Sequence, residues 1–220
     1  IEESAAHRQM TLSAKQPLGV RLASIMHSQL ALYALAFFCL NLSFAQVEAS
    51  YVLLLRDYLD FDARQTGWLF TYIGVCIILV QGGLINTAVR RFGEVGTVGF
   101  GASLLVIGQT LTGIMAVGLL VGNGHPLVQM LIVTTAVCFG FGFSNPALSA
   151  AASNAAGKTT MGGALGMVQG FGALGQVGGL LVAGPLYHLG GAQYSFGFGA
   201  AITMILLAIA FYLRQRPVSA

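Results

Sequence analysis

The stretch LNLSFAQVEASYVLLL, residues 40–55, places the carboxylate of Glu48 inside a run that otherwise suits a lipid environment. Asn41 and Gln46 lie in the same run. An ionised carboxylate near the centre of a bilayer costs about 2.5–3.5 kcal/mol on insertion scales, so acidic residues in membrane spans are rare. Glu48 is therefore a candidate functional group.

The composition of the whole chain is that of an integral membrane protein. Of 220 residues, 56% are hydrophobic and 8% are charged, and the mean hydropathy is +0.79. A soluble domain carries roughly 25% charged residues. The 30 glycines follow no Gly-X-Y period, which favours close packing of membrane helices. Gly175 with Gly179 and Gly166 with Gly170 have the spacing for such contacts.

Six segments are apolar enough to cross the roughly 30 Å hydrocarbon core, which takes about 20 residues. Their apolar runs are continuous, which predicts helices instead of the alternating strands of a barrel. The fold class expected is an all-α membrane protein with six transmembrane helices. The expected spans are 30–55, 67–89, 95–120, 127–147, 164–186 and 196–213.

The positive charges predict the orientation. With both termini in the cytoplasm, eight Lys and Arg residues lie inside, and only Arg56 and Arg64 lie outside, as the positive-inside rule requires. We expect residues 1–29 to be a polar cytoplasmic segment, the end of a central loop in a longer protein, and residues 214–220 to be a cytoplasmic tail.

The chain repeats itself at an offset of 96 residues. The glycine pair and leucine at 82–84 fall on those at 178–180, and Phe100-Gly101 falls on Phe196-Gly197. An offset that moves three helices onto the next three relates units of opposite topology, which is typical of secondary transporters. We therefore expect two inverted three-helix repeats, residues 30–120 and 121–213.

Three stretches carry a resemblance to a known family. YLDFDARQTGWLFTYIGVCIILVQGGLINTAVRRFGE at 58–94 and GFGASLLVIGQTL at 99–111 resemble the start of the C-terminal half of major facilitator superfamily transporters. Residues 145–191, from NPALSAAASN to LYHLGG, resemble that half's fourth and fifth helices. Within the superfamily, the stretches are most similar to the bacterial drug:proton antiporter branch related to tetracycline efflux proteins.

The resemblance implies a C-terminal six-helix half in a bacterial cytoplasmic membrane. Its partners would be the lipid bilayer, an N-terminal six-helix half, a small-molecule substrate and protons. It also implies an inner-loop gating motif at Gly83, Arg90, Arg91 and Gly93, although Asn86 and Thr87 stand where an acidic residue is expected. Alternatively, the two arginines only fix the orientation.

One face of the first span carries polar and aromatic residues at i, i+4, i+7, i+11 and i+14. Aromatic faces with an amide and a carboxylate suit a cavity for amphipathic molecules. We expect these residues to line a substrate cavity, with Glu48 as the proton-coupling group. The alternative is an ordinary helix interface in which Asn41 and Glu48 bind neighbouring helices. The five are Phe37, Asn41, Phe44, Glu48 and Tyr51.

Two further helices supply candidate cavity residues. Gln169 and Gln176 are seven residues apart, so both amides point the same way from their helix. Interhelical hydrogen bonds are the alternative role for these glutamines. Asn145 precedes Pro146, which removes a helical hydrogen bond and bends the helix.

Several function classes are disfavoured. The cysteines at 39, 76 and 138 stand singly without metal-ligand spacing, and no nucleophile–base pair suggests an enzyme. We expect no metal, cofactor or nucleic acid. The function predicted is proton-coupled efflux of small amphipathic or drug-like molecules by alternating access. A uniporter or importer, with Glu48 binding substrate, and a non-transporting membrane scaffold are the alternatives.

Overall fold

The computed structural model describes residues 29–116, 118, 125–156 and 161–215. Almost all of them are helical, so the all-α prediction is confirmed. The predicted polar segment, except Gln29, and the tail beyond Gln215 lie outside the described residues. The elements are α3 (Gln29–Leu59), α4 (Ala63–Leu79), the π-helical turn η1 (Val80–Leu84), α5 (Ile85–Ala116), α6 (Pro126–Ala156) and α7 (Met161–Gln215).

Four helical stretches in the described chain are long and apolar enough to cross a membrane. Six separate helices are therefore not confirmed: span 67–89 and residues 95–116 of the next span lie in one stretch of 54 residues, and spans 164–186 and 196–213 lie in one of 55. The pairs merge because one or two glycines, without connecting loops, interrupt them. The backbone leaves the helical region at Gly93 (φ 72°, ψ 173°) and at Gly190 and Gly191 (φ 70° for Gly191), and a positive φ favours glycine.

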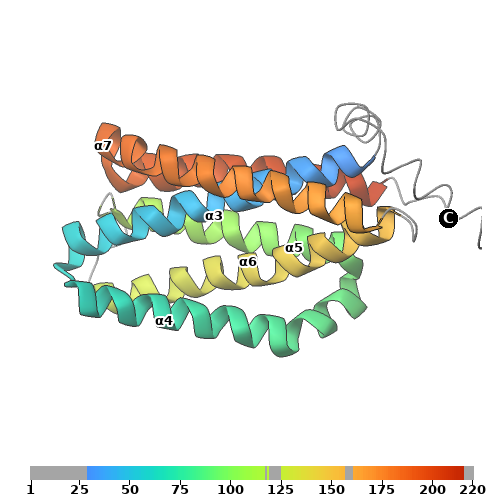
Figure 1. The fold of residues 1–220 in the computed structure, drawn as a ribbon. Helices are drawn as coiled ribbons and strands as arrows, with labels where there is room; N and C mark the ends of the chain where they lie inside the picture. Colours follow the sequence, from blue (N-terminus) through green and yellow to red (C-terminus); the bar gives the residue numbers. More distant parts are fainter. Residues whose placement is uncertain (1–28, 117, 119–124, 157–160, 216–220) are drawn as a thin grey trace, which may run out of the picture.

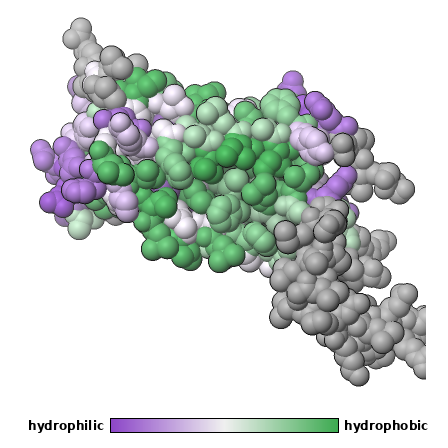
Figure 2. Space-filling model, turned by 90° about the horizontal axis from the view of Figure 1, so that it is seen from above, coloured by the Kyte–Doolittle hydropathy of each residue, from purple (hydrophilic) through white to green (hydrophobic). Residues whose placement is uncertain are grey.

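The helices run alongside one another (Figure 1). The chain turns within α5, at Gly93, at the right of this view, and α7 runs out in orange and back in red. α3 lies in the interior, because 56% of its most apolar window is buried, compared with 22% for the stretch from α4 to α5. Hydrophobic surface covers the middle of the molecule, and hydrophilic residues gather at its ends (Figure 2).

Glycines set the closest helix contacts. A Cβ on Gly175 would collide with the Phe38 carbonyl oxygen of α3, and one on Gly179 with the Leu42 carbonyl oxygen. The close packing expected of this pair is therefore confirmed. A Cβ on Gly166 or Gly170 would meet nothing within 4 Å, so that pair makes no such contact.

Candidate transport site

Glu48 is half-buried on α3 and lines a small cavity between α3, α4 and α6. The cavity volume is about 10 Å³, which is close to the room that one water molecule needs. Phe44 and Tyr51 line the same cavity, so the structure brings three members of the predicted stripe together. The other lining residues are Val47, Ile73, Thr134, Val137 and Cys138.

Phe44 connects the stripe to α6. Its ring stacks on Phe141, with centroids 3.8 Å apart and an interplanar angle of 18°. Asn145 lies one helical turn beyond Phe141 and is half-buried. Because residues four apart share a face of a helix, Asn145 lies on the same face of α6 as Phe141.

Asn41 connects the stripe to α7. Its amide nitrogen Nδ2 donates a hydrogen bond to the Phe37 carbonyl oxygen at 2.9 Å. A Cβ on Gly172 would approach the same nitrogen to 3.0 Å, so the missing side chain leaves room for Asn41 against α7. Gln169 and Gln176 stand one turn to either side of Gly172, and both are exposed.

A hydrogen bond also connects α6 to α7: the Gln169 amide Nε2 donates to the Ser149 hydroxyl at 3.4 Å. Ser149 lies four residues beyond Asn145 and is half-buried, so it belongs to the same face of α6. Three helices therefore present polar groups beside one another. We call these residues the polar face: Asn41, Glu48, Asn145, Ser149, Gln169 and Gln176.

Phe37 and Tyr51, the two ends of the stripe, lie in the core. They are 1% and 2% exposed. The Tyr51 hydroxyl is 3.4 Å from the hydroxyls of Thr112 and Thr134, and its ring meets Phe196 edge-on at 5.2 Å. The stripe is therefore accessible in its middle and closed at both ends, and a substrate contact by either end residue stays a prediction.

The predicted gating motif extends from η1 to the turn within α5. Gly83 is exposed in η1, and Gly93 carries the backbone break. Arg90 and Arg91 are exposed, and the Arg91 guanidinium carbon lies 5.7 Å from the Phe92 ring centroid. The structure thus gives Gly93 the role of a turn, and gating by the arginines stays a prediction.

A buried hydrogen-bond network lies on the opposite side of α3, and the sequence analysis missed it. Ser43, Gln46 and Ser50 are 0% exposed. The Gln46 amide Nε2 donates to Ser195 on α7 at 2.7 Å and to Ser50 at 3.0 Å. The spacing i, i+3, i+7 of the three α3 residues is a signal that could have revealed this face.

The network extends to α5. The Ser43 hydroxyl lies 2.8 Å from that of Thr203 and accepts a hydrogen bond from the Gln109 amide at 2.9 Å. The Thr203 hydroxyl also lies 3.3 Å from Gln109 Oε1. These contacts join α3, α5 and α7, although the buried Gln46 Oε1 has no hydrogen-bond partner among the described residues. The polar face is thus the accessible side of α3.

Comparisons with known proteins agree on a family. Residues 30–220 match the sequence profile of the Major Facilitator Superfamily. The crystal structure of the human organic anion transporter MFSD10 (TETRAN) is similar, with a TM-score of 0.71 and 26% sequence identity over 89% of this chain. This chain covers 42% of that protein. A search of curated proteins finds no match.

Proposed function

Because the chain belongs to the Major Facilitator Superfamily, we propose that it is the C-terminal half of a secondary active transporter that works by alternating access. It is a multi-pass membrane protein of a transporter family, not an enzyme. The part of the human transporter that it matches, 42% of that chain, supports a half-transporter. The other half would be an N-terminal six-helix bundle, in the same protein or in a separate chain.

The two longest helical stretches support six crossings. At 1.5 Å per residue, 54 residues extend about 80 Å, more than twice the roughly 30 Å hydrocarbon core. Each long stretch therefore crosses twice, turning at Gly93 or at Gly190 and Gly191. With six crossings, both termini lie on the same side, which we assign to the bacterial cytoplasm from the positive charges.

The polar face is the proposed substrate site, and Glu48 is the proposed proton-coupling group. One observation carries this proposal: the carboxylate is half-buried beside a cavity with room for about one water. Such a group can take up a proton in one state and release it in another. The Phe44–Phe141 stack and the amides of Asn41 and Gln169 offer apolar area and hydrogen bonds together, which suits small amphipathic substrates.

An organic anion is a second candidate substrate, because the similar human protein is described as an organic anion transporter. The polar face offers amide N–H donors to an anion but carries no cation among its six residues. Glu48 would have to be protonated while the anion is bound. Transport of an anion with protonated Glu48 would therefore also be coupled to protons. The alternatives, a uniporter or importer in which Glu48 binds the substrate and a non-transporting scaffold, involve no such coupling.

Transport by the full-length protein in proteoliposomes, with an imposed pH gradient and a substrate panel, tests the proposal. Wild type should accumulate a substrate in response to the gradient. Glu48→Gln should bind the substrate but lose the response to pH. Asp60→Asn is the matched control, since it removes a carboxylate from the exposed connection between α3 and α4. An unchanged pH response in Glu48→Gln would refute proton coupling through this residue, and no transport by wild type would favour the scaffold.

A further inference from the structure

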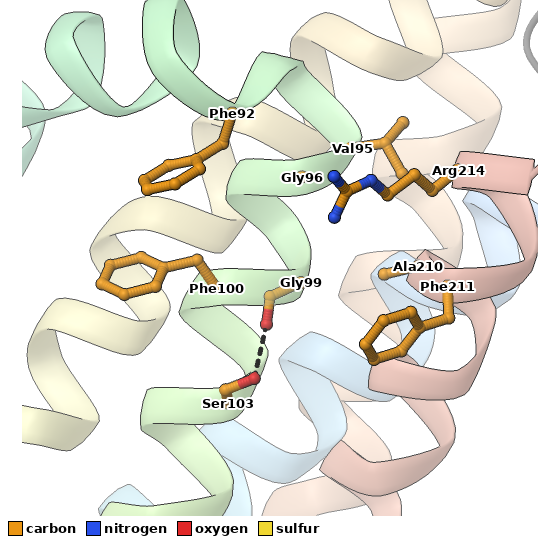
Figure 3. Close-up of a pocket in the computed structure, with 9 residues that line it drawn as sticks. All are labelled: Phe92, Val95, Gly96, Gly99, Phe100, Ser103, Ala210, Phe211 and Arg214. Carbon is orange, nitrogen blue, oxygen red and sulfur yellow. Dashed lines mark hydrogen bonds between the residues drawn. The ribbon is translucent and has the colours of Figure 1, made fainter.

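A second feature lies away from the polar face: a groove of about 210 Å³ between the beginning of α5 and the end of α7 (Figure 3). Gly96 and Gly99 form part of its floor. Phe92 and Phe100 also line it, with ring centroids 5.7 Å apart and an interplanar angle of 20°, but Figure 3 shows both rings turned to the side of α5 away from Phe211. The Phe211 ring lies on the α7 side and is 55% exposed. An exposed aromatic ring therefore borders the groove on its α7 side.

The accessible lining of the groove is partly polar and partly apolar. The one hydroxyl that lines it, on Ser103, donates to the Gly99 carbonyl oxygen at 2.9 Å. A Cβ on Gly99 would meet only Ala210, at 4.0 Å, so the glycine leaves space that an apolar chain can fill. The apolar part of the lining, beside this space, is suited to an acyl chain.

The end of the groove is positively charged. Figure 3 shows the exposed Arg214 guanidinium reaching from α7 toward Gly96. Arg91 precedes Phe92 on α5, and its guanidinium carbon lies 5.7 Å from the centroid of the Phe92 ring. The nearby acid, Glu94, accepts a hydrogen bond from Asn154 of α6 at 2.7 Å. The mouth of the groove can therefore hold an anion.

The length of the groove matches one leaflet. From Val95 to Ser103, the helix rises about 12 Å, and half of a hydrocarbon core is about 15 Å. We propose that this groove binds one anionic phospholipid, with an acyl chain along Gly96 and Gly99 and the phosphate on Arg214. Basic pockets between membrane helices bind such headgroups. The proposal rests on the membrane location of the chain and is independent of Glu48 and of transport.

Photocrosslinking tests it. The full-length protein is placed in phosphatidylcholine nanodiscs with photoactivatable phosphatidylglycerol or photoactivatable phosphatidylcholine as the probe, and adducts on residues 92–103 and 210–214 are quantified by mass spectrometry. Wild type should label more strongly with phosphatidylglycerol. Arg214→Gln should lower that labelling about fivefold, as expected for one cation at a membrane surface, and leave labelling by phosphatidylcholine unchanged.

Two further variants complete the test. Gly99→Leu should fill the groove and reduce labelling by both lipids. Arg64→Gln, which removes an exposed arginine at the start of α4, should label like wild type. Equal labelling by the two lipids in wild type, or unchanged labelling in Arg214→Gln, would overturn the proposal. Complete competition by excess inorganic phosphate would also overturn it, since the site would then bind free anions.

Discussion

The ring of Phe44 in α3 lies face to face with the ring of Phe141 in α6, with centroids 3.8 Å apart. This stack lies between Glu48 and Asn145 along the two helices, and both residues are half-buried. The stack therefore places an apolar surface between two residues of the polar face.

Replacing one ring of this stack should weaken substrate binding. Aromatic pairs contribute about 0.5–1.5 kcal/mol beyond their buried area, so Phe141→Leu should raise KM for aromatic substrates about two- to twelvefold. Phe211→Leu is the control, because its ring lies in the groove between α5 and α7. Initial rates in proteoliposomes measure both. Equal KM values for the two variants would remove the stack from the substrate site.

Thr203 and Thr71 form a matched pair for the buried network. Each hydroxyl donates to the carbonyl oxygen four residues earlier at 2.9 Å, but Thr203 is buried and also contacts Ser43 and Gln109. We expect Thr203→Val to lower the free energy of unfolding by about 1 kcal/mol, within the range for interhelical hydrogen bonds in membranes. Thr71→Val, on the exposed side of α4, should change it little.

Titration from mild detergent into a denaturing detergent measures both free energies. If the two valine variants lost the same stability, the intrahelical bond alone would explain the loss. The contacts of Thr203 with α3 and α5 would then contribute nothing measurable.

Gly175 and Gly166 test the close approach of α7 to α3. Alanine at Gly175 would collide with the Phe38 carbonyl oxygen, whereas alanine at Gly166 meets open space. Gly175→Ala should therefore lower the free energy of unfolding by about 1–3 kcal/mol, as overpacking does. Gly166→Ala should keep or raise it, because alanine favours a helix by up to about 1 kcal/mol. The same titration distinguishes them, and equal stabilities would contradict the backbone contact.

The apolar runs predicted the helices but not their lengths. The expected span 127–147 corresponds to α6, which continues to Ala156. A hydropathy window marks the part of a helix that suits lipid, whereas the helix itself ends where backbone hydrogen bonding ends. Alanines at 150–152 favour helix and carry it past the apolar run. The break at Gly93 falls between the expected spans 67–89 and 95–120, but the helix resumes there at once, without the connecting loop that two separate spans would need.

Residues that correspond in the sequence repeat do not share the same environment. Gly83 and Gly179 correspond at the 96-residue offset, yet a Cβ on Gly83 meets nothing within 4 Å and one on Gly179 collides with Leu42 of α3. Which glycine packs depends on the neighbouring helix, which the local sequence does not specify. The sequence analysis overlooked Ser43 and Ser50 for the same reason. Serine is also common as a small packing residue, and only the fold shows that Gln109 and Ser195 lie beside these two hydroxyls.

At the start of α4, two substitutions of Asp62 distinguish the contribution of its negative charge to stability from that of its hydrogen bond. Asp62 caps the helix: its carboxylate accepts from the Gln65 backbone N–H at 2.7 Å, and the Gln65 side chain accepts from the Asp62 N–H at 2.9 Å. Asp62→Ala should lower the free energy of unfolding by about 1 kcal/mol. Asp62→Asn should retain most of the wild-type stability, because asparagine is as good an N-cap residue as aspartate. If Asp62→Asn lost as much stability as Asp62→Ala, the negative charge at the helix start would be the stabilising feature in place of the capping bond.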